Sequence, residues 1–245
     1  DALGSIAHAK MLGQIGLLTE VETTSVVIAL EEIIKEVESG NFEIEDSFED
    51  VHSKIEYLLT IKLGDAGKKI HTARSRNDQV LVDVHLYLKD VVKELKEQVK
   101  VLFDLLMESA DKHQNVLLPG YTHLQIAMPS SFGMWFSAYA ESLIDDITML
   151  NAALKVVDQN PLGSAAGYGS SFPINRTFTT QELQFETLKF NAVAAQMSRG
   201  KAEKTVAFAM SSVAATLAKF SMDVCLYMSQ NFDFISLPSH LTTGS

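Results

Sequence analysis

Residues 77–113 read NDQVLVDVHLYLKDVVKELKEQVKVLFDLLMESADKH, and this stretch decides the fold class of the chain. Apolar residues recur along it at intervals of three and four, the spacing that gives an α-helix one buried face. They are Val80, Val84, Leu88, Val91, Val92, Leu95, Val99, Leu102 and Leu106. Because no proline or glycine interrupts the pattern, we predict one helix of more than about 50 Å at ~1.5 Å per residue. Helices of this length are typical of bundles.

Helical periodicity also dominates the rest of the sequence. Two more long helices are predicted, one from residue 130 to about 157 and one from residue 198 to about 231. Shorter helices are expected at residues 24–39, between a threonine cap and Gly40, and at residues 51–63. The strand-like runs are too short to support a sheet, so the predicted fold class is all-α, a long-helix bundle.

We predict two domains. The first is an N-terminal helical domain, residues 1–75, and the second is a central long-helix bundle domain, residues 76–245. The sequence opens within a helical pattern, DALGSIAHAKMLGQIGLL, and closes on LTTGS. Neither reads as a natural terminus, so we expect both domains to continue beyond the sequence.

The last long helix carries apolar and small residues on several faces at once. A helix that is apolar around most of its girth is usually buried on most sides. One subunit offers too few helices to cover it, so we expect a homo-oligomer formed through the bundle. A membrane span is the rival interpretation, and five charged residues argue against it. These are Lys201, Glu203, Lys204, Lys219 and Asp223.

Composition limits the partners. The chain has 20 Lys and Arg against 31 Asp and Glu, a net charge of −11, which disfavours nucleic acid and anionic membranes as partners. Cys225 is the single cysteine, so no intrachain disulfide forms and a reducing compartment fits. The sequence shows no signal peptide or long uncharged apolar run. We therefore expect a soluble cytoplasmic protein.

Residues 71–80, HTARSRNDQV, crowd polar side chains more densely than a structural role requires. Arg74 and Arg76 offer planar donors that match carboxylates, while Asn77 and Gln79 offer both donors and acceptors. The segment therefore fits an anionic, amide-rich small molecule. A solvated helix start with ordinary charged caps is the alternative.

This segment closely resembles the signature of the argininosuccinate lyase family, within the fumarase/aspartase superfamily to which δ-crystallins are related. Two further stretches fall in the expected order, GYTHLQIAMPSSFG at residues 120–133 and PLGSAAGYGSSFPINR at residues 161–176. The resemblance covers essentially the whole chain. It implies a helical bundle of the fumarase/aspartase type, no cofactor, and a tetramer whose sites are shared between subunits. It also implies cleavage of argininosuccinate to arginine and fumarate by β-elimination, in arginine biosynthesis.

The resemblance assigns roles to two groups of residues. Between Pro119 and Pro129, which mark a turn or loop, it makes His123 part of the acid and base machinery and places Thr122 and Gln125 at the substrate. Near the signature it places Arg76, Asn77 and His52 at the substrate. By itself a histidine on a connector is often only solvated, and His52 also fits a helix-surface histidine.

Two features of the resemblance are incomplete. Ser245 aligns with the first serine of the family's mobile Gly-Ser-Ser loop, the usual base for the substrate proton, but the residues that would follow it are missing. We therefore expect this fragment alone to be inactive or crippled. Where such lyases commonly have Ser-Asp-Arg-Asp, this chain has Met197, Ser198, Arg199 and Gly200, which leaves the orientation of Arg199 in doubt.

No metal or nucleotide site is predicted. The histidines show no metal-ligand spacing and there is no cysteine pair. The glycine-rich residues 162–172 lack the preceding strand that phosphate-binding loops require. Their small side chains instead allow backbone amides to pack near a ligand or another subunit, or they form a flexible connector.

Two other functions stay open. One is another fumarate-releasing lyase, acting on adenylosuccinate, malate or aspartate. The other is a structural role without catalysis, as in the lens crystallins of this family. The signature favours argininosuccinate over the first alternative, and the presence of Asn77, Thr122, His123 and Ser245 permits activity without proving it.

Overall fold

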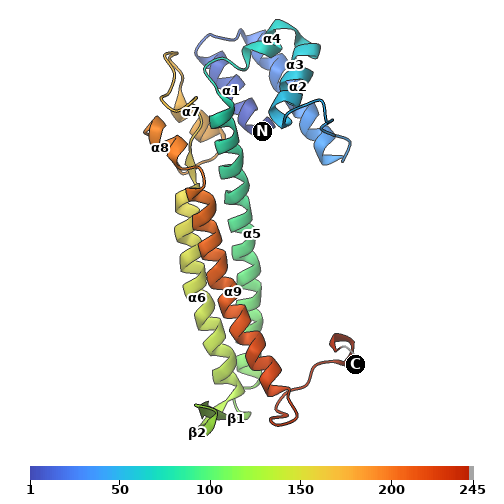
Figure 1. Cartoon of the computed structure of the whole chain (residues 1–245), viewed down its shortest axis with the longest axis vertical. Coiled ribbons are helices and arrows are strands. Elements are labelled where there is room, and N and C mark those ends of the chain that lie inside the picture. Colours follow the sequence, from blue (N-terminus) through green and yellow to red (C-terminus); the bar gives the residue numbers. More distant parts are fainter. Residues whose placement is uncertain (243–245) are drawn as a thin grey trace. The chain divides into compact units, whose positions relative to one another are not determined.

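The computed structural model describes residues 1–242 and divides the chain into two compact units. The first unit takes residues 1–90 and 155–203, and the second takes residues 91–154 and 204–245. Three long helices each contribute residues to both units (Figure 1). They are α5 (Arg76–Lys112), α6 (Phe132–Val157) and α9 (Lys201–Tyr227).

The first unit is built on a core between short helices. Buried residues of α1 and α2, among them Leu12 and Leu30, pack with Leu59 of α3 and with Ile70. The unit also contains α4, α7, α8 and a short parallel pair, β3 with β4. The bounds are α1 Ala2–Gln14, α2 Glu20–Glu38, α3 Val51–Leu63, α4 Asp65–Lys69, β3 Gln159–Asn160, α7 Arg176–Glu182, β4 Thr187–Leu188 and α8 Ala192–Met197.

Local capping explains where α2 and α3 begin. The Thr19 hydroxyl accepts the backbone N–H of Glu22, and the Glu22 carboxylate accepts the N–H of Thr19, which together form a capping box. The prediction that this helix starts at Thr24 was therefore wrong by about one turn, because the first turn is polar and lacks the apolar period. The predicted bounds of α3, 51–63, are confirmed, and Asp50 caps it by accepting the N–H of Ser53.

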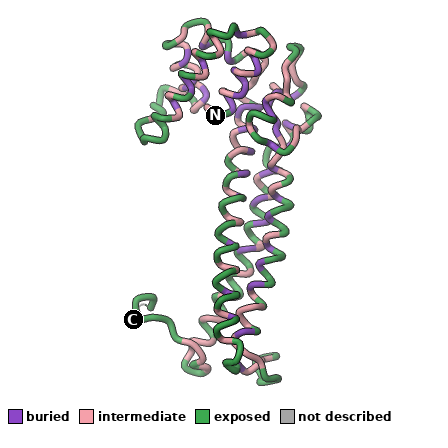
Figure 2. Tube along the Cα trace, turned by 180° about the vertical axis from the view of Figure 1, so that it is seen from behind, coloured by how far each residue is buried: buried purple, intermediate pink, exposed green. Residues whose placement is uncertain are grey.

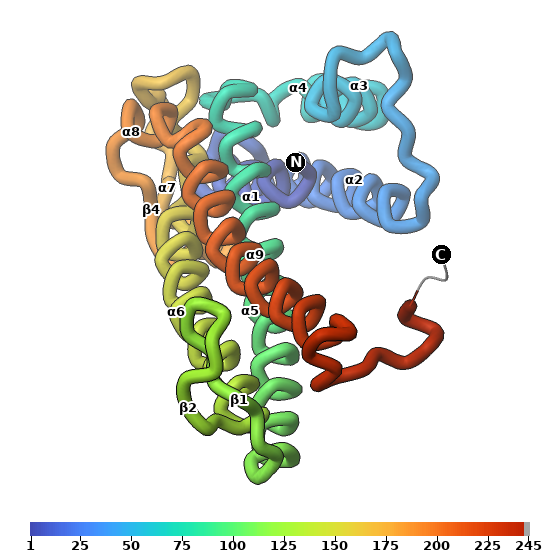
Figure 3. The backbone as a smooth tube through the Cα atoms, turned by 60° about the horizontal axis from the view of Figure 1, so that its bottom comes forward, coloured from blue at the N-terminus to red at the C-terminus, as the bar shows by residue number. Residues whose placement is uncertain are grey.

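In the second unit, α5, α6 and α9 run side by side (Figures 1 and 3). Buried side chains from each helix form its interior, as the purple positions along the tube show (Figure 2). Three hydrogen bonds join α6 to α9: Ser212 donates to Asp146 over 2.6 Å, and Asp223 accepts from both Trp135 and Tyr139. The buried apolar residues of the three helices in this unit are Val92, Val99, Leu106, Ala110, Ala140, Leu143, Leu150, Ala153, Val206, Ala209 and Val213.

The predicted long helices and the all-α fold class are confirmed, with small differences at the helix ends. The segment predicted as a turn or loop between Pro119 and Pro129 is instead a β-hairpin of β1 (Leu117–Thr122) and β2 (Gln125–Ser131). Its two prolines face each other across the pair. Both strands are edge strands, and there a missing N–H donor is tolerated.

The compact units are bounded differently from the predicted domains 1–75 and 76–245. The division in α5 falls after Asp90, and residues 155–203 return to the first unit. The predicted domain boundary itself stays a prediction.

Helix α9 is long and apolar enough to cross a membrane by length and composition alone, the one such helix among residues 1–242. Its most apolar window has a mean hydropathy of 1.3, and 17% of that window is buried. Asp223 of α9 accepts hydrogen bonds from Trp135 and Tyr139 of α6, which places α9 in the bundle, so its exposed apolar side chains need an explanation other than a membrane.

Candidate active site

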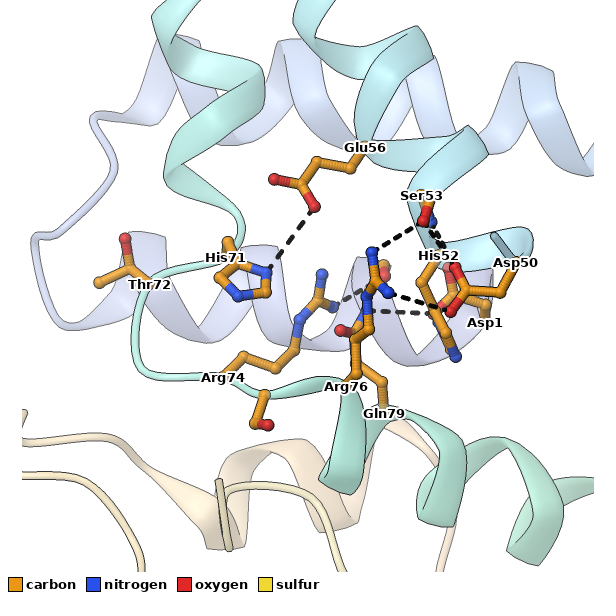
Figure 4. Close-up of polar contacts among 12 residues, drawn as sticks. Asp1, Asp50, His52, Ser53, Glu56, His71, Thr72, Arg74, Arg76 and Gln79 are labelled. Atoms are coloured by element: carbon orange, nitrogen blue, oxygen red, sulfur yellow. Dashed lines mark hydrogen bonds and ion pairs between the residues drawn. The ribbon is translucent and has the colours of Figure 1, made fainter. Parts of the chain in front are cut away.

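The signature, residues 71–80, forms a turn followed by the first residues of α5 (Figure 4). Asp78 is fully buried, and its Oδ1 accepts the backbone N–H of Ser75 over 2.9 Å, which stabilises the start of the helix. Arg76 and Asn77 therefore lie on the first turn of α5, and Asn77 is exposed. Helix geometry rather than loop flexibility fixes their backbone.

The two arginines of the signature have different environments. Arg74 is half-buried and donates from Nη1 to the Ser5 hydroxyl over 2.8 Å. Burial lowers the pKa of Arg74 to about 10, against the opposing effect of the nearby Asp78 and Asp83 carboxylates. The guanidinium is still charged at neutral pH, and its hydrogen bond to Ser5 stabilises the interior of the first unit.

Arg76 instead faces the start of α3. Its Nη1 lies 2.5 Å from the Glu49 carboxylate and 3.5 Å from that of Asp50, and its Nη2 donates to the Ser53 hydroxyl over 2.8 Å. The hydrogen bond to Glu49 raises the pKa of Arg76 above its ordinary value. A guanidinium held among carboxylates here is suited to exchange one of them for the carboxylate of a ligand.

His52 is buried rather than on a helix surface. Its Nδ1 lies 3.0 Å from Asp1 Oδ1 and 4.0 Å from Asp83 Oδ2, and Gln79 donates to the same Asp1 oxygen over 3.4 Å. Burial lowers the pKa of His52, while Asp83 and Asp50 oppose that shift.

Among the described residues, His52, Asp1 and Asp83 form a group that could hold a metal ion. The donor atoms of Asp1, His52 and Asp83 all lie within 4.8 Å of one another. Sequence spacing could not show this, because the residues come from three separate segments. The positive charge of Arg74, attracted to Asp83, makes the surroundings less favourable for a cation.

The hairpin presents the second group of predicted residues. Thr122 pairs with Gln125, so His123 and Leu124 are the two residues of the turn. Both have positive φ, 52° and 59°, as a type I′ turn requires, although neither is a glycine or asparagine. Thr122, His123 and Gln125 are exposed. Backbone strain of this kind concentrates at functional sites.

Aromatic packing supports the hairpin next to its turn, at Tyr121. The ring of Tyr121 meets that of Phe232 edge to face, 5.4 Å between centroids, and that of Phe234 at 6.5 Å. Tyr227 contacts both of these phenylalanine rings. The segment after α9 thus supports the strand that leads to Thr122 and His123.

The predicted residues therefore form two groups. His52, Arg76 and Asn77 belong to the first unit, and Thr122, His123 and Gln125 belong to the second. Between Asn77 and His123 the chain passes through α5, whose 37 residues make it about 55 Å long. Ser245 lies outside the described residues. The chemical roles of all these residues stay predictions.

The glycine-rich segment, residues 162–172, begins beside the signature. The backbone N–H groups of Gly163 and Ala165 donate to Asp78 Oδ2 over 2.9 and 3.0 Å. Arg176 donates to four backbone carbonyls on either side of it, those of Pro161, Leu162, Lys189 and Phe190. Both segments stand out in the sequence, but only the fold shows that they meet.

Local structure explains why the residues around Arg199 differ from the Ser-Asp-Arg-Asp of the family. Ser198 is buried and donates from its hydroxyl to the Ala195 carbonyl, and Arg199 is exposed in the turn between α8 and α9. Gly200 has φ of 75°, a conformation that an aspartate adopts only at a cost. Ser198 and Gly200, which stand where the family has acidic residues, therefore stabilise the turn between α8 and α9.

Comparison with known proteins finds matches along the whole chain. A family model described as lyase matches residues 1–245. Argininosuccinate lyases from Bacteroides fragilis and Xylella fastidiosa are 56% and 42% identical over all 245 residues, and the chain covers 55% of each relative. The chain thus spans about half the length of the curated relatives it matches.

Solved structures share the fold. EDDS lyase in complex with formate matches 97% of this chain and 46% of its own, with a TM-score of 0.88 at 22% identity. A fumarate lyase/δ-crystallin from Brucella melitensis bound to cobalt matches 100% of this chain and 60% of its own, with a TM-score of 0.80 at 20% identity. At these identities the likeness is one of fold alone.

Proposed function

Since the chain belongs to the lyase family, we propose that the protein it forms part of cleaves argininosuccinate to arginine and fumarate by β-elimination, within arginine biosynthesis. The observation that carries the proposal is the 56% identity to an argininosuccinate lyase over every residue of the chain. Arg76 and Asn77 at the start of α5 and His123 at the hairpin tip are the residues we assign to the reaction.

In the proposed reaction a base removes a proton from the carbon beside one carboxylate of the succinyl group. The bond from the adjacent carbon to the guanidino nitrogen then breaks, and that nitrogen takes up a proton, which yields arginine and fumarate. The carbon acid is weak, so the site must stabilise the negative charge that accumulates on the carboxylate. We assign Arg76 and Asn77, together with Thr122 and Gln125, to contacts that hold the carboxylates and guanidino group of the bound substrate, and place His52 near them.

We assign the protonation of the departing nitrogen to His123, as proton donor or as the group that orients the donor. The exposed position of His123 at the hairpin tip supports this assignment, since its side chain is accessible to a ligand. Removal of the carbon-bound proton is assigned to Ser245. An alkoxide base needs donors around it to lower its basicity.

We further propose a cytoplasmic homo-oligomer, a tetramer, whose sites combine residues of different subunits. Two features support this. Helix α5 lies in the chain between Asn77 and His123. The second unit also has a groove of about 280 Å³ whose lining is both apolar and charged and includes Phe103, Ile144 and Lys100, and it exposes Phe208 and Met222 on α9.

The test uses the full-length protein. Fumarate absorbance is followed with argininosuccinate, then with adenylosuccinate, malate and aspartate as alternative substrates. We expect fumarate from argininosuccinate alone. Release only from another substrate would replace the proposal by a different fumarate-releasing activity, and release from none would leave the crystallin-like structural role.

A further inference from the structure

We propose that Asp78 is a positioning residue: its buried carboxylate joins the start of α5 to the glycine-rich segment, residues 162–172, so that these two parts form one rigid half of the substrate site. This inference rests on the proposed function, because it assumes that Arg76 and Asn77 bind the substrate. Asp78 itself touches no substrate in this scheme.

The carboxylate of Asp78 has donors on both sides. Oδ1 accepts the N–H of Ser75, the residue just before Arg76, and Oδ2 accepts the N–H groups of Gly163 and Ala165. The residue is 0% exposed, so no water competes for these bonds. Three backbone N–H groups on one buried carboxylate form charge-assisted hydrogen bonds, the stronger class.

The glycine-rich segment needs an external partner at this point. Gly163 and Ala165 have φ of 87° and 51°, and Ala165 carries the steric cost of a left-handed conformation. The N–H groups of both residues point at Asp78 Oδ2. The backbone carbonyl oxygens just before them, those of Pro161 and Leu162, accept hydrogen bonds from Arg176. The Asp78 carboxylate thus compensates for a backbone conformation that is unfavourable by itself.

The anchored and free parts of the segment are sharply divided. Ser164 is fully buried, and Gln196 donates to both its hydroxyl and the Ala165 carbonyl over 2.9 Å. Three residues after Ala165, the stretch from Tyr168 to Phe172 begins; its residues are half-buried or exposed, and Tyr168 is 91% exposed. Asp78 therefore holds the base of a segment whose tip projects into solvent.

The consequence is mechanical coupling between the segment and the substrate-binding turn. Ser75 N–H and the amides of Gly163 and Ala165 share one carboxylate, so displacement of the segment moves the residue before Arg76. Substrate contacts made equally in ground state and transition state affect KM without changing kcat. Loss of the hydrogen bonds to Asp78 should therefore raise KM and leave kcat nearly unchanged.

The test compares Asp78→Asn with Gln196→Ala in the full-length enzyme. An asparagine cannot accept from both sides, because its amide NH₂ faces one set of N–H donors. We expect Asp78→Asn to raise KM for argininosuccinate at least tenfold with kcat changed less than threefold. The matched control Gln196→Ala removes the hydrogen bonds from Gln196 to the segment and keeps those of Asp78. It should shift KM less than twofold. A fall in kcat with unchanged KM would overturn the proposal, because it signals only a loss of folded enzyme.

A second measurement covers the case in which Asp78→Asn does not fold. In the wild-type full-length enzyme, hydrogen exchange at Gly163 and Ala165 is read by mass spectrometry with and without saturating fumarate. We expect fumarate to slow exchange at both amides. Equal exchange with and without fumarate in an enzyme that cleaves argininosuccinate would overturn the positioning role of Asp78 and leave the proposed function in place. An enzyme that releases no fumarate from argininosuccinate would overturn the proposed function instead.

Discussion

Arg76 and Glu49 form an ion pair at 2.5 Å, in which the guanidinium assigned to a substrate carboxylate already holds a carboxylate of its own chain. Glu49 is 77% exposed and Asp50 is committed to capping α3, so Glu49 is the group that a ligand displaces most readily. Surface ion pairs of this kind contribute about 0.2–1 kcal/mol. Competition from Glu49 is therefore weak but measurable.

Removal of this competitor should improve substrate binding. We expect Glu49→Gln to lower KM for argininosuccinate by up to about fivefold, the equivalent of ~1 kcal/mol, with kcat unchanged. The control is Glu45→Gln, which removes an ion pair with Lys54 on the same surface and does not touch Arg76. A raised KM in Glu49→Gln would show that Glu49 orients Arg76 rather than occupying its binding edge.

Replacement of His123 should separate catalysis from folding. His123→Gln in the full-length enzyme is expected to lower kcat a hundredfold or more, the usual range for loss of a general acid or base. Its side chain is exposed at a hairpin tip, so the midpoint of thermal unfolding should stay within about 2 °C. His113→Gln, beyond the end of α5, is the control and should keep normal turnover. An unchanged kcat in His123→Gln removes that residue from the mechanism.

Close packing of α4 against α3 should make Gly67 intolerant of a side chain. A Cβ on Gly67 would lie 2.3 Å from the Leu59 carbonyl oxygen and 2.8 Å from the Thr60 nitrogen, both backbone atoms that cannot move alone. We expect Gly67→Ala to lower the free energy of unfolding by about 2–3 kcal/mol. Lys68→Ala, on the exposed side of the same helix, should cost less than about 0.5 kcal/mol. Urea unfolding followed by circular dichroism compares the two, and equal losses would contradict the packing argument.

Acid should destabilise the first unit through His8. Burial lowers the pKa of His8 from 6.5 to about 3, and its Nε2 is hydrogen-bonded with the Thr72 carbonyl oxygen at 2.9 Å. Between pH 6.5 and pH 3 the unfolded state therefore binds one proton more than the folded state, so stability falls as the pH falls. At about 1.4 kcal/mol per pH unit, the loss from this group reaches ~3 kcal/mol at pH 4.

The measurement is urea unfolding of the full-length protein at pH 7, 5 and 4, for the wild type and for His8→Gln. The variant is expected to be less stable at pH 7 because it disturbs a buried contact, and to show a shallower fall toward pH 4. Parallel pH profiles for the two proteins would exclude His8 as a source of the acid sensitivity.

The sequence predicted the helices whose signal is periodic and whose ends are marked. Residues 77–113 correspond to α5 at 76–112, and α3 has the predicted bounds. The hairpin at residues 117–131 was not predicted. Its strands contain prolines and its turn is not Asn-Gly, so the sequence lacks the usual signals of a hairpin. Only the pairing of Pro119 with Pro129 shows that both prolines lie on edge strands.

Sequence alone determined which residue types could bind an anionic substrate and that long helices carry them, because side-chain chemistry and the 3.6-residue period are local properties. Tertiary structure decided their neighbours. It turned Arg74 toward Ser5 and Arg76 toward Glu49, buried His52 beside Asp1 and Asp83, and brought Gly163 and Ala165 to Asp78 from 85 and 87 residues away. Burial and hydrogen-bond geometry depend on contacts between distant segments, and no local pattern encodes them.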